Sequence, residues 1–442
     1  MAISTTSKRD LEANGNGESK PGESKGGSQR KQNKKKRSFG MGRCLCAVIL
    51  LNIIVPLFVV VSWSVNRPST VPVPEKILQT RASNFRQPIQ DIVQSVDEQV
   101  SAERAQMRSK SGDKPRRRSR EAKRLAIIEK REAGKEGLWE KSHGMDPELL
   151  EPDEDGCIVH PLQYGPINNV YSCEDFERID EHRGEKLGSG YFRDVYKVNY
   201  EGHEMVWKKL RKQQKHSHRN RERHAWEAAA LSHLQGHPNI VQMLGLCKYD
   251  MLTEYMPVFL ENIVYDDAIE LPLSAVLQIS LDLANGIKAM HNAEGGPMVH
   301  TDIKPSQMLF DRDGVAKVND LNRMRFMRHH VDGGSCPFYI KTNNGIWRSP
   351  EEYAGGDLTE KLDIYSLSLV FYTLVAREEP FSDLDEDADS SDDGYYKTVV
   401  LHGGRPHLDP EWDQDYVDLM TDMWGDWPEG RPSATEIVDR LE

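Results

Sequence analysis

The sequence lacks the features that mark several protein classes. Its 442 residues contain six cysteines, and no spacing among them resembles a zinc site. No period of about 20–50 residues recurs, which excludes a repeat architecture. The chain also has no N-x-[ST] acceptor for N-glycosylation. A small zinc domain, a solenoid and a heavily glycosylated ectodomain are therefore all disfavoured.

Positive charge is scarce in the larger, C-terminal part of the chain. The net charge is -12 at pH 7, yet residues 1–43 and 66–150 are each net positive, so the excess of acid falls in residues 151–442. A nucleic-acid-binding domain needs a basic surface to meet the phosphate backbone. The composition therefore excludes nucleic acid as a partner.

One apolar run stands out, because residues 44–65 contain no charged side chain. At ~1.5 Å per residue, a helix of this length spans roughly 33 Å, enough to cross the ~30 Å hydrocarbon layer of a bilayer. The basic lead of residues 1–43 is too long for a cleaved signal peptide, and no A-x-A-like site follows the run. The sequence predicts a disordered basic tail (1–43) and one transmembrane signal-anchor helix (44–65) that gives membrane association.

The flanking charge predicts how this helix is oriented. Residues 24–43 hold eight Lys and Arg, whereas residues 66–85 hold three. Because the more positive flank stays cytosolic, we expect a type II protein whose C-terminal part lies in the lumen of the endoplasmic reticulum or Golgi. The absent glycosylation acceptor and a second basic cluster at 114–124 fit a cytosolic C-terminal part instead.

A stem is predicted over residues 66–150, followed by a cysteine-containing lead-in over 151–183. The Pro- and Gln-containing stretch 66–100 is expected to be extended. Residues 119–142 are rich in helix formers and predict a solvated helix, with a coiled coil as the alternative. In an oxidising lumen, Cys157 and Cys173 are the expected disulfide pair.

Glycines open the globular part at a turn between two predicted strands. Gly188 and Gly190 lie in KLGSGYFRDVYK, before an apolar strand that includes Val195. Glycines at such a turn let backbone amides close over phosphate oxygens. The third glycine of a G-x-G-x-x-G pattern is replaced by Arg193, which would either touch phosphate or point to solvent.

A lysine and a glutamate are predicted to pair behind this turn. Lys208 lies within a short apolar strand (MVWKKL), where an ammonium group is costly without a partner. Glu227, on the predicted helix RERHAWEAAALSHL, is the expected partner, with Glu222 as its rival. Such a lysine holds the α- and β-phosphates of a nucleotide.

The strongest signal is VHTDIKPSQMLF, followed ten residues later by KVNDLNRMRF. Asp302 would orient an acceptor hydroxyl and take its proton, and Lys304 would neutralise the transferring phosphoryl group. Asp320 would bind a Mg²⁺ ion that bridges the phosphates, with Gln307 as the second metal ligand. These residue types in this order predict phosphoryl transfer.

These motifs together resemble those of the eukaryotic protein kinase domain over residues 184–442. The resemblance implies a bilobal α+β fold with an N-lobe over 184–256 and a C-lobe over 257–442. It also implies that ATP, with Mg²⁺ or Mn²⁺, sits between the lobes against a hinge at Glu254–Met256.

Further motifs support the same resemblance. The sequence Ser349-Pro350-Glu351 resembles the A-P-E motif that ends an activation segment. By the same likeness, Asp363 would brace the catalytic loop and Arg431 would pair with Glu351. The Arg that usually precedes the catalytic Asp is Thr301 here, so a phosphorylated activation segment loses its usual anchor.

A narrower resemblance concerns the substrate. The predicted anchor, the S-C-E-D stretch and the N-D-L-N turn are similar to those of secretory-pathway kinases of the protein O-mannose kinase type. That resemblance implies a glycan hydroxyl as acceptor, but the H-T-D-I-K loop is closer to the general kinase pattern than theirs. The expected acceptor is therefore Ser/Thr of a protein or glycoprotein, with a glycan hydroxyl as the alternative. A pseudokinase scaffold is the other alternative, because Arg193, Gln307 and Asn322 depart from the usual pattern.

Overall fold

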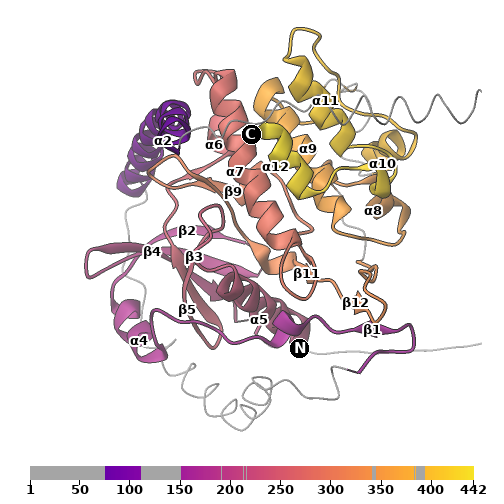
Figure 1. Ribbon diagram of the computed structural model, residues 1–442. Coiled ribbons are helices and arrows are strands. Elements are labelled where there is room, and N and C mark those ends of the chain that lie inside the picture. The colour runs from indigo at the N-terminus through magenta and orange to yellow at the C-terminus, as the bar shows by residue number, and fades with distance from the viewer. Residues whose placement is uncertain are drawn as a thin grey trace, which may run out of the picture. The chain divides into compact units, whose positions relative to one another are not determined.

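The computed structural model describes residues 75–110 and 151–442, except 191, 213, 216, 341–344, 383 and 385–393. From residue 151 onward the described chain is α+β, with an antiparallel sheet followed by a largely helical lobe (Figure 1). The α+β class inferred from the sequence is confirmed.

The N-terminal lobe is built on one five-stranded antiparallel sheet with the order β2-β3-β4-β6-β5. Its strands are β2 (Arg183–Ser189), β3 (Arg193–Tyr200), β4 (His203–Leu210), β5 (Met243–Cys247) and β6 (Asp250–Glu254). Helix α5 (His218–His233) joins β4 to β5 and buries its small residues Ala228–Ala230 in the core. On the preceding helix α4 (Cys173–Glu181), Phe176 and Ile179 pack in a cluster with Trp207 of β4.

The C-terminal lobe is organised around two apolar helices, α7 (Leu273–His291) and α9 (Lys361–Ala376). Helix α9 is buried on nearly all sides, which agrees with its continuous apolar sequence. The other helices gather around this pair (Figure 1): α6 (Glu261–Val264), α8 (Pro350–Ala354), α10 (Gly394–Leu401), α11 (Gln414–Met423) and α12 (Ala434–Leu441).

Short strands and turns join the two lobes and carry the candidate site. Strand β9 (Met308–Phe310) pairs with β7 (Val258–Phe259) and β10 (Ala316–Val318), while β8 (Met298–Val299) pairs with β11 (Arg325–Phe326). Strand β1 (Cys157–Ile158) pairs with β12 (His329–His330). The 3₁₀ turns are η4 (Pro161–Tyr164), η5 (Pro305–Gln307), η6 (Leu321–Arg323) and η7 (Pro428–Gly430).

The predicted Cys157–Cys173 disulfide is wrong. Cys157 bonds to Cys336, with Cα atoms 6.3 Å apart, and Cys173 bonds to Cys247, with Cα atoms 5.1 Å apart. Cys157 lies on β1, which pairs with β12 near Cys336, whereas Cys173 begins α4 beside β5. Closeness along the sequence was misleading because the pairing depends on long-range strand and helix contacts.

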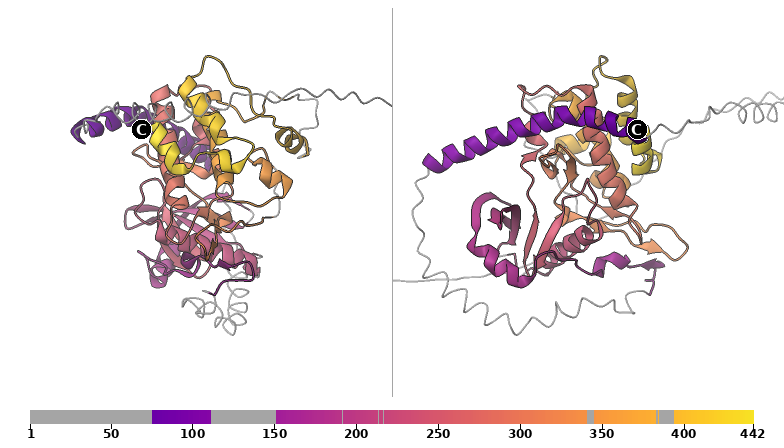
Figure 2. Two further views of the ribbon diagram at one scale, coloured as in Figure 1. Left: turned by 45° about the vertical axis from the view of Figure 1, so that its right-hand side comes forward. Right: turned by 60° about the vertical axis from the view of Figure 1, so that its left-hand side comes forward.

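The stem prediction is also wrong for residues 75–100, which are helical rather than extended. They belong to α2 (Glu75–Lys110), a helix that continues through Pro88 (Figure 2). Ile89, Val93 and Val96 repeat at helical spacing and are between 1% and 3% exposed in the main core. Burial of this apolar face offsets the interior proline, which costs about 3 kcal/mol. The helix predicted at 119–142 lies outside the described residues.

Polar contacts fix α2 against α7 and the β9–β10 turn. Arg86 donates to both carboxylate oxygens of Asp282 at 2.7 and 2.8 Å. Asp282 also accepts the backbone N–H of Ala316. Gly314, at φ +74°, permits this close approach, because a Cβ there would lie 2.8 Å from the backbone nitrogen of Gln90. The helix is therefore part of the folded domain.

A charge on the buried face of α2 is expected to destabilise the whole domain. Val93→Asp buries an unpaired carboxylate, and we expect it to lower the free energy of unfolding by roughly 3 kcal/mol or more. Ser95→Asp, at an exposed position of the same helix, should change it by less than about 0.5 kcal/mol. Urea unfolding of the two variants measures the difference, and equal effects would contradict docking of α2.

Within the ranges that the structure describes, no helix combines the length and apolar character needed to cross a bilayer. The predicted spanning segment 44–65 and the predicted basic tail lie outside those ranges.

Candidate active site

A buried carboxylate holds the loop that carries Asp302. Asp363 of α9, with no exposed surface, accepts the backbone N–H groups of His300 at 2.6 Å and Thr301 at 2.9 Å. It also lies 3.0 Å from His291 Nε2. Thr301 has φ +62°, an uncommon conformation that needs such support. The bracing role implied for Asp363 is thus matched by its contacts.

Asp302 lies among three cations. Its Oδ1 accepts from Arg348 at 2.7 Å and from Arg323 at 3.2 Å, while Oδ2 lies 3.8 Å from Lys304 Nζ. Burial raises the pKa of this carboxyl, but Arg323, Lys304 and Arg348 outweigh burial and hold the pKa below its ordinary value. Asp302 is therefore ionised at neutral pH and can accept a hydrogen bond from a hydroxyl.

The two expected metal ligands lie on neighbouring segments. Gln307 ends η5. Its backbone carbonyl accepts the backbone N–H of Asn319, the residue before Asp320, at 3.0 Å. Among the described residues, no group of three or more His, Cys, Asp or Glu could hold a metal by itself. Mg²⁺ commonly uses one or two carboxylates together with substrate phosphates. The donor set of Asp320 and Gln307 fits a metal that arrives with a nucleotide.

Asp320, rather than Asn322, adopts the left-handed conformation in the N-D-L-N turn. Asp320 has φ +60° and ψ +59°, while Asn322 lies within η6. The side-chain amide of Asn322 donates to Asp320 Oδ1. Asparagine tolerates positive φ better than most residues, but Asn322 does not adopt it here. It instead orients the Asp320 carboxylate.

Lys208 lies beside its expected partner Glu227 and also contacts Asn319. Its Nζ lies 3.7 Å from Glu227 Oε1 and donates to Asn319 Oδ1 at 3.0 Å. The rival Glu222 instead contacts His218 on the same helix. Asn319 also accepts His300 Nε2 at its carbonyl, 2.9 Å away. Asn319 thus contacts the side chain of Lys208 and His300 in the Asp302 loop, and it directly precedes Asp320 in the chain.

The glycine turn joins β2 to β3. Gly188 and Gly190 are exposed, and a Cβ added at Gly188 would meet nothing within 4 Å. Neither glycine has a positive φ, so the described protein does not itself require glycine there. Close approach of a ligand to the backbone supplies that requirement. Val195 pairs across the strands with Lys208.

The predicted hinge residues are held by the β9–β10 region. The Glu254 carboxylate accepts from Lys317 Nζ at 3.0 Å to both oxygens, so its side chain is already engaged. Met256 is buried with Val241 and Leu309. With both side chains engaged in these contacts, the backbone groups of Glu254 and Met256 are the ones that could serve a nucleotide base.

A buried acid lies next to this centre on α8. Arg348 donates to Glu352 Oε1 at 3.4 Å, and Ser349 donates its N–H and Oγ to Oε2. Burial nevertheless raises the pKa of Glu352 to about 7. The neighbouring Glu351 forms the expected bidentate pair with Arg431, at 2.7 and 2.8 Å.

This pKa predicts a pH dependence of stability. The unfolded carboxyl ionises near 4.5, whereas the folded one keeps its proton up to about pH 7. Unfolding therefore releases a proton between these values, and stability falls as pH rises through them. Relative to Glu352→Gln, the wild-type protein should lose on the order of 3 kcal/mol of unfolding free energy between pH 4.5 and 8. Urea unfolding of both proteins at several pH values tests this, and a wild-type protein that stays constant or gains stability relative to Glu352→Gln over this range would refute it.

Comparison with known proteins identifies the fold that carries this geometry. The model of the protein kinase domain family matches residues 182–441. The chain belongs to this family. Because Asn319 contacts both Lys208 and the loop that carries Asp302, and directly precedes Asp320, the match supports a kinase-like phosphotransferase.

Curated relatives are also protein kinases. The chain is 31% identical over 227 residues to the probable serine/threonine-protein kinase drkC of Dictyostelium discoideum, covering 49% of this chain and 28% of the relative. It is 27% identical over 289 residues to drkA of the same organism, covering 63% and 42%. It is 29% identical over 266 residues to the dual specificity protein kinase shkA, also from Dictyostelium, covering 58% and 48%. The chain thus spans less than half of each relative's length.

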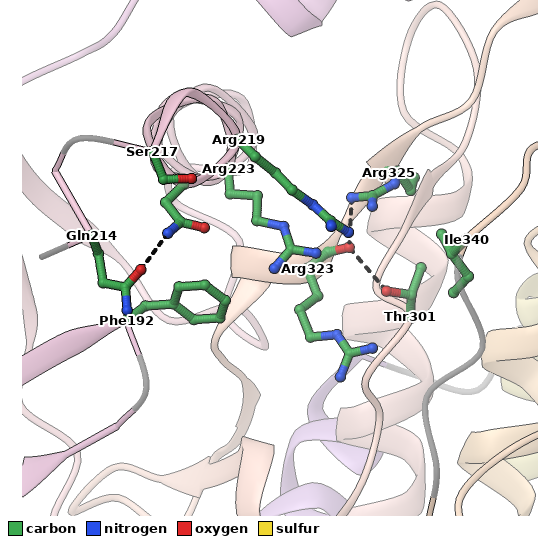
Figure 3. Close-up of a pocket in the computed structure, with 10 residues that line it drawn as sticks. Phe192, Gln214, Ser217, Arg219, Arg223, Thr301, Arg323, Arg325 and Ile340 are labelled. Carbon is green, nitrogen blue, oxygen red and sulfur yellow. Dashed lines mark hydrogen bonds between the residues drawn. The ribbon is translucent and has the colours of Figure 1, made fainter. Parts of the chain in front are cut away.

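Beside the catalytic loop of the kinase domain lies a cavity of about 500 Å³ that is rich in arginine. Figure 3 shows Arg219 and Arg223 of α5 opposite Arg323 and Arg325. No acidic residue is among its described lining residues. Burial and the charges of the other three arginines lower the pKa of Arg325 to about 10. The pocket therefore carries positive charge that no described lining residue neutralises.

This pocket changes the interpretation of Thr301. Considered alone, the loss of an arginine at position 301 removed the usual anchor of a phosphorylated activation segment. Thr301 lines the pocket together with four arginines, so this region is positively charged even though position 301 is not an arginine. The signal was present in RNRER and NRMRF, whose arginines become neighbours only after folding. The sequence reasoning also missed Asn319, Arg323 and Arg348 as neighbours of Lys208 and Asp302.

Proposed function

We propose that this protein transfers the γ-phosphate of ATP to a Ser or Thr hydroxyl of a protein. The observation that carries the proposal is the pair of contacts made by Asn319, which bonds to Lys208 and to His300 of the Asp302 loop and directly precedes Asp320. The protein kinase domain match and the serine/threonine kinase relatives support the same reaction class.

The residues divide the reaction among them. Lys208 and the backbone of the glycine turn would hold the phosphates, and Lys304 would meet the transferring group. Asp320 and Gln307 would hold Mg²⁺, which neutralises charge on the phosphate oxygens when bound. Asp302 would orient the acceptor hydroxyl, whose oxygen bonds to the γ-phosphorus as the bond to ADP breaks. The hydroxyl proton passes to the Asp302 carboxylate.

The test is phosphate transfer from γ-labelled ATP by the full-length protein in detergent. Acceptors are a Ser/Thr peptide library and, separately, mannose-bearing glycopeptides with no free Ser or Thr. Label on the peptides supports the proposal, whereas label on the glycopeptides alone would replace it with the glycan kinase alternative. Magnesium-dependent ATP binding without transfer to any acceptor would identify a pseudokinase.

The location of the domain is a separate part of the proposal. We place the kinase domain in the lumen of the secretory pathway, anchored by residues 44–65. The basic flank before that segment supports this orientation. The geometry of Cys157–Cys336 and Cys173–Cys247 is compatible with an oxidising compartment. Protease added to sealed microsomes decides the question, because digestion of the domain in intact vesicles would place it in the cytosol.

A further inference from the structure

Arg193 occupies the position of the third glycine in the turn. Its side chain points into the protein rather than to solvent. Arg193 begins β3 and pairs with Leu210 of β4, while Val195 pairs with Lys208. Residues two apart on a strand project to the same face, so Arg193 shares a face with Val195. Its side chain is 7% exposed. The earlier alternative of an arginine that points to solvent is therefore wrong.

Arg193 is the main partner of Glu227. Its Nη2 atom donates to Glu227 Oε2, whereas Lys208 Nζ lies 3.7 Å from the other carboxylate oxygen, beyond hydrogen-bond distance. Arg193 Nη2 also lies 2.9 Å from His224 Nδ1. Burial lowers the pKa of His224 to about 3, so this imidazole is neutral and can accept the bond. Glu227 is thus shared between two cations.

Two donors of this arginine remain without a partner. Arg193 Nε and Nη1 are buried and make no hydrogen bond to any described residue. Buried donors are rarely left unpaired unless a ligand completes them. Burial lowers the pKa of Arg193, but the charge of Glu227, its hydrogen bond and the charge of Asp320 together raise it above the ordinary value. Arg193 is therefore a charged guanidinium with two unused donors.

We propose that Arg193 is a second phosphate-binding cation, which donates from Nε and Nη1 to terminal phosphate oxygens of the nucleotide. A guanidinium fork matches phosphate geometry, and hydrogen bonds between charged groups are stronger than neutral ones. In this arrangement Lys208 and Arg193 both face the phosphates, and Glu227 holds the two cations apart. The inference rests on the proposed function and adds a specific residue to its nucleotide site.

The test compares MgATP with adenosine, which has no phosphates, by calorimetry on the full-length protein. Arg193→Gly restores the usual glycine and should weaken MgATP binding about 10- to 100-fold, with adenosine affinity unchanged. Arg193→Lys should recover part of the loss. Arg178→Ala removes the same charge from an exposed site on α4 and should change neither affinity. If Arg193→Gly does not fold, Arg193→Gln serves instead, with the same expected loss.

A double variant separates direct binding from support of Glu227. With Lys208→Met as the background, Arg193→Gly should weaken MgATP binding by a further factor of about 10 or more. No further loss would mean that Arg193 acts only through Glu227 and Lys208, and the proposal would be wrong. An unchanged MgATP affinity in the single variant would also overturn it. A wild-type protein that fails to bind MgATP would instead refute the proposed function.

Discussion

Asp302→Asn should abolish phosphate transfer while MgATP still binds with wild-type affinity. The asparagine keeps the shape of the side chain but cannot take the proton of the acceptor hydroxyl. Positioned general bases contribute about 10²–10⁴-fold, so we expect kcat to fall by that factor. Nucleotide affinity should be preserved, because Asp302 contacts Arg348, Arg323 and Lys304, none of which lies on the glycine turn.

The measurement needs a matched control and a check on folding. Asp313→Asn makes the same chemical change at an exposed turn and should leave kcat unchanged. Removing the charge of Asp302 also leaves Arg348 with one carboxylate partner fewer, so the unfolding temperature of the variant should be recorded. A folded Asp302→Asn protein that retains kcat within tenfold would remove Asp302 from the mechanism.

Asp320→Asn should abolish both transfer and the magnesium dependence of ATP binding. Asparagine tolerates the left-handed backbone that Asp320 adopts, so the turn should survive. What is lost is the negative charge that holds the metal against the phosphates. Electrostatic contributions of this kind are worth several kcal/mol, which predicts a fall in kcat of about 10³-fold or more.

Titration of ATP with and without Mg²⁺ checks this second expectation. Wild-type protein should bind ATP more tightly when Mg²⁺ is present, and Asp320→Asn should show no such difference. Asp332→Asn, at a position whose side chain is 88% exposed, is the control. A variant that keeps its magnesium dependence would assign the metal to other residues.

Contacts among motif residues could be predicted because the family pattern fixes their order along the chain. The pairing of Lys208 with Glu227, the bracing contact of Asp363 and the pair of Glu351 and Arg431 all follow from that order. Each involves a residue type that the chemistry requires at a known element. Sequence alone therefore gave the fold and the centre of the site.

Contacts that depend on neighbours brought together only by folding were missed. The helical repeat of Ile89, Val93 and Val96 was present, but Pro88 and the polar surroundings concealed it. Arg193 was recognised as a departure, yet its inward direction depends on the register between β3 and β4. Arg348 directly precedes the Ser349-Pro350-Glu351 motif, and nothing in that motif indicates that it binds the carboxylate of Asp302.

The Cys157–Cys336 bond has a consequence for motion of the activation segment. That segment begins at Asp320 and ends at the Ser349 cap of α8, and Cys336 lies between these two ends. The bond adds a covalent fixed point to the strand pairings that already hold β11 against β8 and β12 against β1. It therefore reduces further the conformations that are open to the segment in the native protein. Reduction of this one covalent bond would thus widen the range of conformations open to the chain between Asp320 and Ser349.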